Sequence, residues 1–167
     1  MNEYINLKLI EIMKKSIKKM SFIVLAVMVC VGSAFATTCY VTDDDRPIKY
    51  DELPAEAKSF VSKNFAKEQV SHVSLDNDLI GKEYTVVFLS GAKVEFDGDG
   101  AWKEVDCRYS HVPTAIVPEA INTYVKEHYP GSKITELKRE HGNWEAKITG
   151  GLELTFNGNF KLVDIDD

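Results

Sequence analysis

The sequence is poor in residues that build metal centres, and it lacks the familiar catalytic motifs. Its three cysteines and four histidines show no C-x-x-C, H-x-x-x-H or H-E-x-x-H spacing, which excludes the common zinc and dithiol motifs. The G-x-S-x-G, Walker and Rossmann glycine patterns are also absent. These absences favour a protein that is not an enzyme and needs no cofactor.

Positive charge is outnumbered by negative charge. The 167 residues include 20 Lys and Arg against 26 Asp and Glu, a formal net charge of −6. This balance argues against nucleic acid as the main partner, because phosphate binding needs a basic surface. A hydrophobic content of 44% excludes wholesale disorder, and the length fits one ordinary domain or two small ones.

No apolar run reaches the ~20 residues that a membrane helix needs. The longest, residues 22–31, follows a lysine-rich stretch at residues 14–19 and leads into Ala-Phe-Ala at residues 34–36. This order is typical of a secretory signal peptide. Residues 1–36 are therefore predicted to be a cleaved signal peptide, with Met13 as the more usual start. No stable membrane span is expected after cleavage.

Two cysteines remain after this cleavage, Cys39 and Cys107. Lipid attachment needs a small residue directly before the cysteine, and Thr38 fits this requirement poorly, which disfavours a lipoprotein. Exported proteins can keep disulfides. A bridge between Cys39 and Cys107 and a pair of free thiols therefore both stay open, and the expected location is the periplasm or the exterior.

Two similar stretches follow a leader, residues 37–50, that is expected to be flexible. They comprise residues 51–106 and 115–167, joined by a linker at residues 107–114. Matching residues are 64 positions apart at first and then 60. In the last strand the offset becomes 58, which matches Trp102 with Phe160, Val105 with Val163 and Asp106 with Asp164.

Each stretch is predicted to form one amphipathic helix and four strands. Apolar residues recur at helical spacing after a proline, and further on they recur with the period of two that is typical of strands. The expected fold class is α+β, with two tandem helix-plus-four-stranded antiparallel sheet repeats and the helices packed on one sheet face. Whether the sheets join or pack as separate lobes stays open.

The recurring residues resemble the PepSY-like proteins, also described as beta-lactamase-inhibitor-like. The residues that carry the resemblance in the first stretch are Leu53, Pro54, Phe60, Phe65, Tyr84, Gly91, Val94, Phe96, Gly100, Trp102, Val105 and Asp106. Those in the second are Val117, Pro118, Tyr124, Tyr129, Trp144, Gly151, Phe156, Gly158, Phe160, Val163 and Asp164. The resemblance implies an exported bacterial protein of uncharacterised function without established catalytic residues.

The sheet face that the helices leave open is the candidate interaction surface. The interaction candidates are Val87, Leu89, Lys93, Glu95, Tyr109, Lys147 and Glu153. Aromatic anchors usually dominate the binding energy of protein interfaces. The open face is expected to have at most two apolar residues as anchors, which weakens the hypothesis of a beta-lactamase inhibitor.

The sequence therefore favours an exported, non-enzymatic binding or interaction module whose partner is a protein or peptide of the cell envelope. One alternative is an inhibitor of a periplasmic or extracellular enzyme of the beta-lactamase or protease type. Another is a calcium- or small-ligand-binding protein, with Asp97 and Asp99 as weak ligand candidates. A hairpin turn explains both aspartates equally well, because the matching residues of the second stretch are Asn157 and Asn159.

Overall fold

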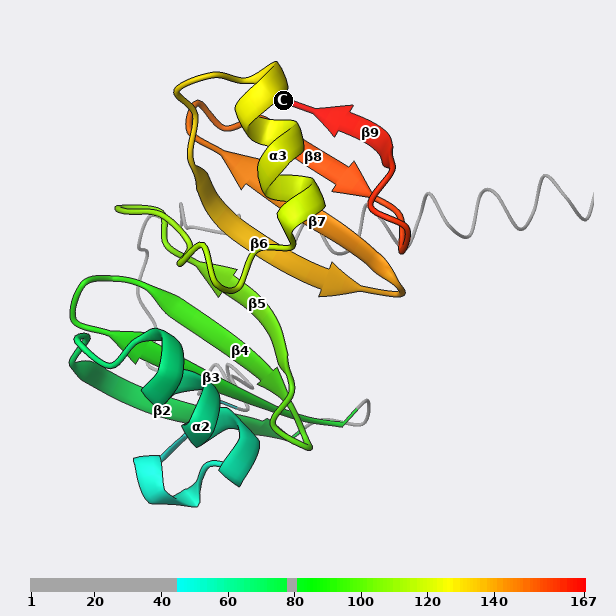
Figure 1. Ribbon diagram of the computed structural model, residues 1–167. Coiled ribbons are helices and arrows are strands. Elements are labelled where there is room, and N and C mark those ends of the chain that lie inside the picture. Colours follow the sequence, from blue (N-terminus) through cyan, green and yellow to red (C-terminus); the bar gives the residue numbers. More distant parts are fainter. Residues whose placement is uncertain (1–44, 78–80) are drawn as a thin grey trace, which may run out of the picture. The chain divides into compact units, whose positions relative to one another are not determined.

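The computed structural model describes residues 45–77 and 81–167. Within them, nine strands form a single antiparallel sheet in the order of the sequence (Figure 1). The strands are β1 (Arg46–Ile48), β2 (Val70–Asn77), β3 (Lys82–Phe88), β4 (Lys93–Asp97), β5 (Trp102–Asp106), β6 (Ile134–Glu140), β7 (Asn143–Ile148), β8 (Glu153–Phe156) and β9 (Leu162–Asp166). The helices of this part of the chain are the short 3-10 helix η2 (Tyr50–Glu52), α2 (Ala55–Asn64) and α3 (Glu119–His128).

The prediction of an α+β fold built from two helix-plus-four-strand repeats is wrong. β5 pairs directly with β6, so the strands of both stretches belong to one sheet. β1, which lies within the predicted leader, adds the ninth strand by pairing with β2. With two α-helices against nine strands in the described residues, the fold is mostly β. The sheets join because an unpaired strand edge leaves backbone N–H and C=O groups without partners.

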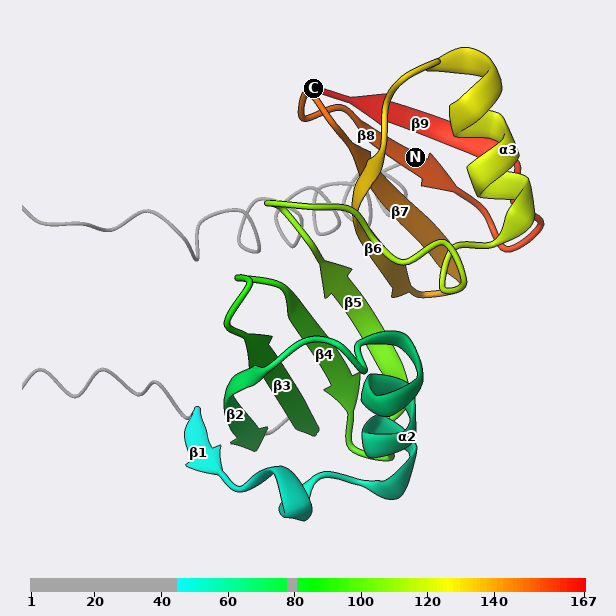
Figure 2. The same ribbon diagram turned by 60° about the vertical axis from the view of Figure 1, so that its left-hand side comes forward.

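One row of apolar side chains crosses the helix-covered face of the sheet. The register places the following residues opposite one another, from β1 to β9: Ile48, Val73, Val86, Val94, Val105, Leu137, Ala146, Leu154 and Ile165. Opposed residues in an antiparallel sheet point to the same face. Both α-helices lie on that face (Figure 2), and their buried residues belong to the same core.

Both helices begin directly after a proline, Pro54 for α2 and Pro118 for α3. A proline is tolerated there because the first N–H groups of a helix have no partner within the helix. Each helix then buries an i, i+4 pair against the sheet. The buried pairs are Ala57 and Val61 in α2 and Ile121 and Val125 in α3.

The last strand continues the offset of 60 and does not shift to 58. Val94 pairs with Val105 in the first stretch, and Leu154 pairs with Ile165 in the second. The structural counterpart of Val105 is therefore Ile165, and the predicted match to Val163 is wrong.

Phe160 consequently takes the place of Gly100 in the turn before the last strand. The N–H of Gly100 donates to the carbonyl of Asp97, and that of Phe160 donates to the carbonyl of Asn157. Both residues have positive φ, +94° and +57°. The ring of Phe160 packs near that of Trp144, with 5.7 Å between centroids. Matching aromatic residues by type thus introduced a gap that the backbone does not have.

Candidate functional site

The sheet face opposite the helices is polar and strongly charged, and we call it the charged face. Two rows of opposed side chains cross it. The first row contains His72, Val87, Lys93, Asp106, Glu136, Lys147, Glu153 and Asp166. The second contains Ser74, Thr85, Glu95, Glu104, Lys138, Glu145, Thr155 and Asp164.

Lys93 is held between carboxylates of β4 and β5. Its Nζ lies 2.7 Å from Oε1 of Glu95 and 3.5 Å from Oε1 of Glu104. Burial lowers the pKa of Lys93, but the hydrogen bond to Glu95 and the charges of Glu104, Glu95 and Asp106 outweigh this, so the pKa is raised. The ammonium group therefore stays charged and helps to hold the carboxylates together.

One lysine does not neutralise this group of carboxylates. Burial, followed by the charge of Glu95, raises the pKa of Glu104 to about 7, although Lys93 opposes the shift. Burial, followed by the charge of Asp106, also raises the pKa of Glu136. Negative charge is thus disfavoured at both positions. An additional cation at this part of the charged face would relieve the repulsion.

Asp106 is the most strongly buried charged residue of the face, with 3% of its surface exposed. Its Oδ2 accepts hydrogen bonds from Nη2 and Nε of Arg108, at 2.5 Å and 3.1 Å. Oδ1 of Asp106 accepts a hydrogen bond from the backbone N–H of Arg108 at 2.9 Å. These three bonds fix the exposed guanidinium at the end of β5, and charge-assisted bonds of this kind are the strong ones.

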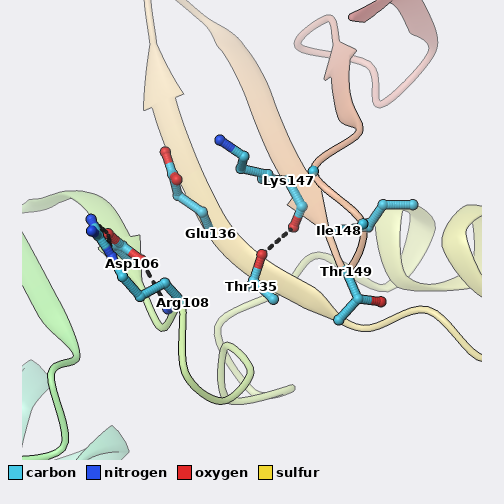
Figure 3. A pocket seen from close by; sticks show the side chains of 9 residues that line it. Asp106, Arg108, Thr135, Glu136, Lys147, Ile148 and Thr149 are labelled. Atoms are coloured by element: carbon cyan, nitrogen blue, oxygen red, sulfur yellow. Dashed lines mark hydrogen bonds and ion pairs between the residues drawn. The ribbon is translucent and has the colours of Figure 1, made fainter. Parts of the chain in front are cut away.

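A hollow of about 490 Å³ opens beside this pair (Figure 3). It is lined by Asp106, Arg108, Thr135, Glu136, Lys147, Ile148, Thr149, Gly150 and Gly151. Carboxylates and cationic groups line it together, whereas histidine, cysteine and serine are not among its lining residues. The hollow can therefore bind polar and charged groups.

Five of the seven predicted interaction residues lie on the charged face. Val87 pairs with Lys93, and Lys147 pairs with Glu153, while Glu95 belongs to the second row. The structure thus gathers these residues on one face, on strands β3, β4, β7 and β8.

The other two predicted residues, Leu89 and Tyr109, are exposed outside the two rows. Leu89 follows the end of β3, and its N–H donates to the carbonyl of Gln69. The ring of Tyr109 lies against Gly91, where an added Cβ would come within 2.8 Å of Cδ2 of the tyrosine.

Sequence patterns did not single out the charged residues at the centre of the face, which are Glu104, Asp106, Glu136 and Lys138. A usable signal was present, because Glu104 and Asp106 flank the apolar Val105, and β6 repeats this alternation. The direct pairing of β5 with β6 was not visible in the sequence. That pairing is what brings the two sets of charges side by side.

The weak calcium candidates lie in the hairpin between β4 and β5. Oδ1 of Asp97 accepts hydrogen bonds from the N–H groups of Asp99 and Ala101, at 3.0 Å and 2.9 Å. Asn157 makes the equivalent two bonds in the second stretch. Over residues 45–77 and 81–167, no three His, Cys, Asp or Glu side chains are grouped so as to hold a metal ion. The hydrogen bonds of Asp97 account for the turn.

Cys107 is buried at the end of β5, and burial raises the pKa of its thiol to about 11. Cys39 lies outside the described residues, as does the predicted signal peptide. The bridge between the two cysteines therefore stays a prediction. No helix within the described ranges is long and apolar enough to cross a bilayer.

Residues 82–164, which run from β3 into β9, match the family model described as "Putative beta-lactamase-inhibitor-like, PepSY-like". Two crystal structures with 40% sequence identity are each covered almost completely by this chain. The chain belongs to the PepSY-like family.

One of these PepSY-like relatives is described as a putative periplasmic protein of the DUF2874 family from Bacteroides vulgatus. It has a TM-score of 0.72, and the match covers 75% of this chain and 99% of the relative. The other is described as a putative calcium-regulated periplasmic protein from Bacteroides thetaiotaomicron, with a TM-score of 0.73 and coverage of 75% and 98%.

A third structure is described as a putative periplasmic protein of unknown function from Bacteroides vulgatus. It is 29% identical, with a TM-score of 0.70 and coverage of 74% and 99%. No match is found among curated proteins. The PepSY-like chain thus resembles structures described as periplasmic proteins.

Proposed function

We propose that this PepSY-like protein is a non-enzymatic periplasmic module that binds a protein partner through the charged face of its sheet. The observation that carries the proposal is the crowding of Glu95, Glu104 and Asp106 around Lys93, with Glu136 opposite Asp106 on the next strand. The location is supported by relatives described as periplasmic.

The electrostatics of the face select a partner with basic side chains. In the free protein the charged forms of Glu104 and Glu136 are disfavoured. A lysine or arginine of the partner placed near both side chains would favour their charged forms. The hollow beside Asp106 and Arg108 offers cationic groups as well, so acidic or amide groups of the partner also find hydrogen-bond donors. Such complementarity contributes to specificity and to the association rate.

Capture from an envelope extract of the source bacterium tests this proposal. We expect the full chain to retain a defined partner, and the double variant Glu104→Gln, Glu136→Gln to lose it. The matched control is Glu68→Gln, Glu127→Gln, which makes the same two substitutions at exposed positions outside the charged face. Retention is expected to weaken as salt rises, because screening reduces attraction between charges.

Two results would contradict the proposal. One is that no protein is retained above background at any salt concentration. The other is that the charged-face variant and the control variant retain the partner equally well.

Inhibition of an envelope enzyme of the beta-lactamase or protease type is a narrower form of this proposal. It is supported by the description of the family model as inhibitor-like. Titration of the protein against a panel of such enzymes tests it. The expected result is stoichiometric loss of one activity, and that loss should disappear with Glu104→Gln, Glu136→Gln.

Calcium binding is a second candidate, because a relative with 40% identity is described as calcium-regulated. The weak ligand candidates of this chain are Asp97 and Asp99, and no group of three His, Cys, Asp or Glu side chains that could hold a metal ion is found in the described residues. Calorimetric titration with calcium chloride is the test. Heat of binding together with a higher melting temperature would support this candidate, because a ligand that binds only the folded state stabilises it. The absence of both would eliminate it.

A further inference from the structure

The outer edge of β9 corresponds to the edge of β5 that β6 covers. Val105 in β5 and Ile165 in β9 occupy equivalent positions, opposite Val94 and Leu154. Val105 is completely buried, because Leu137 of β6 lies opposite it. Ile165 is 46% exposed, since none of the described strands pairs with the outer edge of β9.

The apolar character of this edge extends beyond Ile165. Val163 in the same strand is 55% exposed, and Phe160 in the preceding turn is exposed as well. These three residues are among the few large apolar side chains that the described part of the chain leaves exposed. Native proteins usually keep such residues away from unpaired strand edges, because an apolar edge invites another strand.

The backbone at Ile165 is oriented to receive a strand. Residues that alternate along an antiparallel strand direct their N–H groups to opposite neighbours. In β5 and just beyond it, this pattern directs the backbone of Val105 and Cys107 toward β6, and the N–H of Cys107 donates to the carbonyl of Thr135 at 2.7 Å. The N–H of Ile165 has the equivalent outward orientation, and it donates instead to Oδ1 of Asp164 at 3.1 Å. That carboxylate occupies the place that a carbonyl of an added strand would take.

The charges beside Ile165 indicate which kind of strand fits. Asp164 and Asp166 flank it, and the equivalent of Asp164 in β5 is Glu104, which lies opposite Lys138 of β6. A strand with lysine or arginine at these positions would complement both aspartates. A second copy of β9 paired antiparallel about Ile165 would place Asp164 opposite Asp166, so repulsion disfavours self-association through this edge.

We propose that the β9 edge binds an extended segment of a partner protein as a tenth strand, with an apolar residue opposite Ile165 and basic residues opposite Asp164 and Asp166. This is recognition by strand addition, in which backbone hydrogen bonds provide affinity and alternate side chains provide specificity. The inference rests on the proposed function for the nature of the partner. It uses the β9 edge of the sheet, however, and not Glu104 and Glu136 at the centre of the charged face, so the two can fail independently.

The test is fluorescence polarisation with a labelled synthetic peptide and the full chain. The peptide has the sequence of residues 133–140, the strand that covers β5, and carries Glu136→Lys so that a lysine faces Asp166. The control peptide carries Leu137→Pro in addition, which prevents strand pairing. We expect the first peptide to bind and the control peptide to bind at least about tenfold more weakly, because it loses a backbone hydrogen bond and an apolar contact.

Two protein variants locate the binding at this edge. Ile165→Pro removes an N–H that points outward, so it leaves the pairing with β8 intact. It should lower the affinity for the peptide by about tenfold or more. Asp164→Lys reverses a charge on an exposed strand and should also lower the affinity for the peptide. Thermal unfolding monitored by circular dichroism verifies that both variants fold. The variant Glu104→Gln, Glu136→Gln should bind the peptide as the unmodified chain does, which separates this inference from the proposed function.

Three outcomes would overturn the inference. The first is that the peptide does not bind the unmodified chain. The second is that Ile165→Pro and Asp164→Lys both leave its affinity unchanged. The third is that analytical ultracentrifugation finds a dimer that Ile165→Pro converts to a monomer, because the occupant of the edge would then be a second copy of this chain.

Discussion

The guanidinium of Arg139 lies over the indole of Trp102, with 4.2 Å between its Cζ and the ring centroid. Nε of the same arginine donates to the backbone carbonyl of Trp102 at 3.2 Å, and Nη2 donates to it as well. Trp102 is in β5 and Arg139 is in β6, the two strands through which the stretches of the chain join. The contact therefore reinforces the backbone pairing between these strands.

Replacing Arg139 tests this role. Arg139→Ala is expected to lower the free energy of unfolding by about 1–2 kcal/mol, through loss of the cation–π contact and the hydrogen bonds to the carbonyl. Urea unfolding measures the change. Lys126→Ala, at an exposed position of α3, is the control and should stay within about 0.5 kcal/mol. Equal effects of the two substitutions would contradict the role given to Arg139.

The raised pKa of Glu104 predicts that the protein loses stability as the pH rises. Its pKa is raised from 4.5 to about 7 in the folded protein, so the folded state holds the proton more tightly than the unfolded state does. Its contribution to stability is complete below pH 4.5 and is lost as the pH rises to 7.

Glu104→Gln should therefore stabilise the protein at pH 8, by at most about 3 kcal/mol at 1.36 kcal/mol per pKa unit, and have little effect at pH 4. Urea unfolding at both pH values measures the difference. Glu127→Gln, which changes an exposed carboxylate outside the charged face, is the matched control at both pH values. A stabilisation of the same size at both pH values would contradict the raised pKa of Glu104.

Gly100 is predicted to tolerate a side chain less well than another glycine with the same backbone conformation. A Cβ on Gly100 would lie 2.7 Å from Cβ of Pro54 and 3.0 Å from the backbone N of Ala57, whereas one on Gly151 would meet nothing within 4 Å. The φ angles of the two glycines, +94° and +95°, are nearly equal.

Gly151→Ala should cost about 1–2 kcal/mol, from the positive φ alone. Gly100→Ala should cost about 1–3 kcal/mol more, because the start of α2 must move away from the hairpin between β4 and β5. Thermal unfolding of the two variants side by side gives the difference. If both cost the same, the close packing of α2 against this turn is incorrect.

The pairing of β5 with β6 predicts unequal costs at two apolar positions. Leu137→Ala empties a completely buried position between Val105 and Ala146 and should cost about 2–5 kcal/mol. Ile165→Ala removes a half-exposed side chain from the edge strand and should cost well under half as much. Denaturant unfolding of both variants is the measurement. A larger loss at Ile165 than at Leu137 would contradict the arrangement of the sheet.

Local patterns in the sequence were sufficient to identify several features of the structure. Tyr84, Phe88 and Phe96 lie at alternating positions of β3 and β4, as the period-two pattern predicts, and all three are buried. The family could also be recognised, because the spacing of its apolar residues and glycines is contained in the chain itself. Such features are predictable because strand alternation depends only on neighbouring residues of the same segment.

The sequence by itself determined which side chains face the core within a strand, where the helices begin, and the family to which the chain belongs. Only the tertiary structure decided that β5 and β6 join all strands into one sheet, that Ile165 and not Val163 matches Val105, and that Glu104 and Glu136 meet on the charged face. The reason is physical. Pairing between strands is chosen by backbone hydrogen bonds between distant segments, and the raised pKa of Glu104 exists only after burial has brought those carboxylates together.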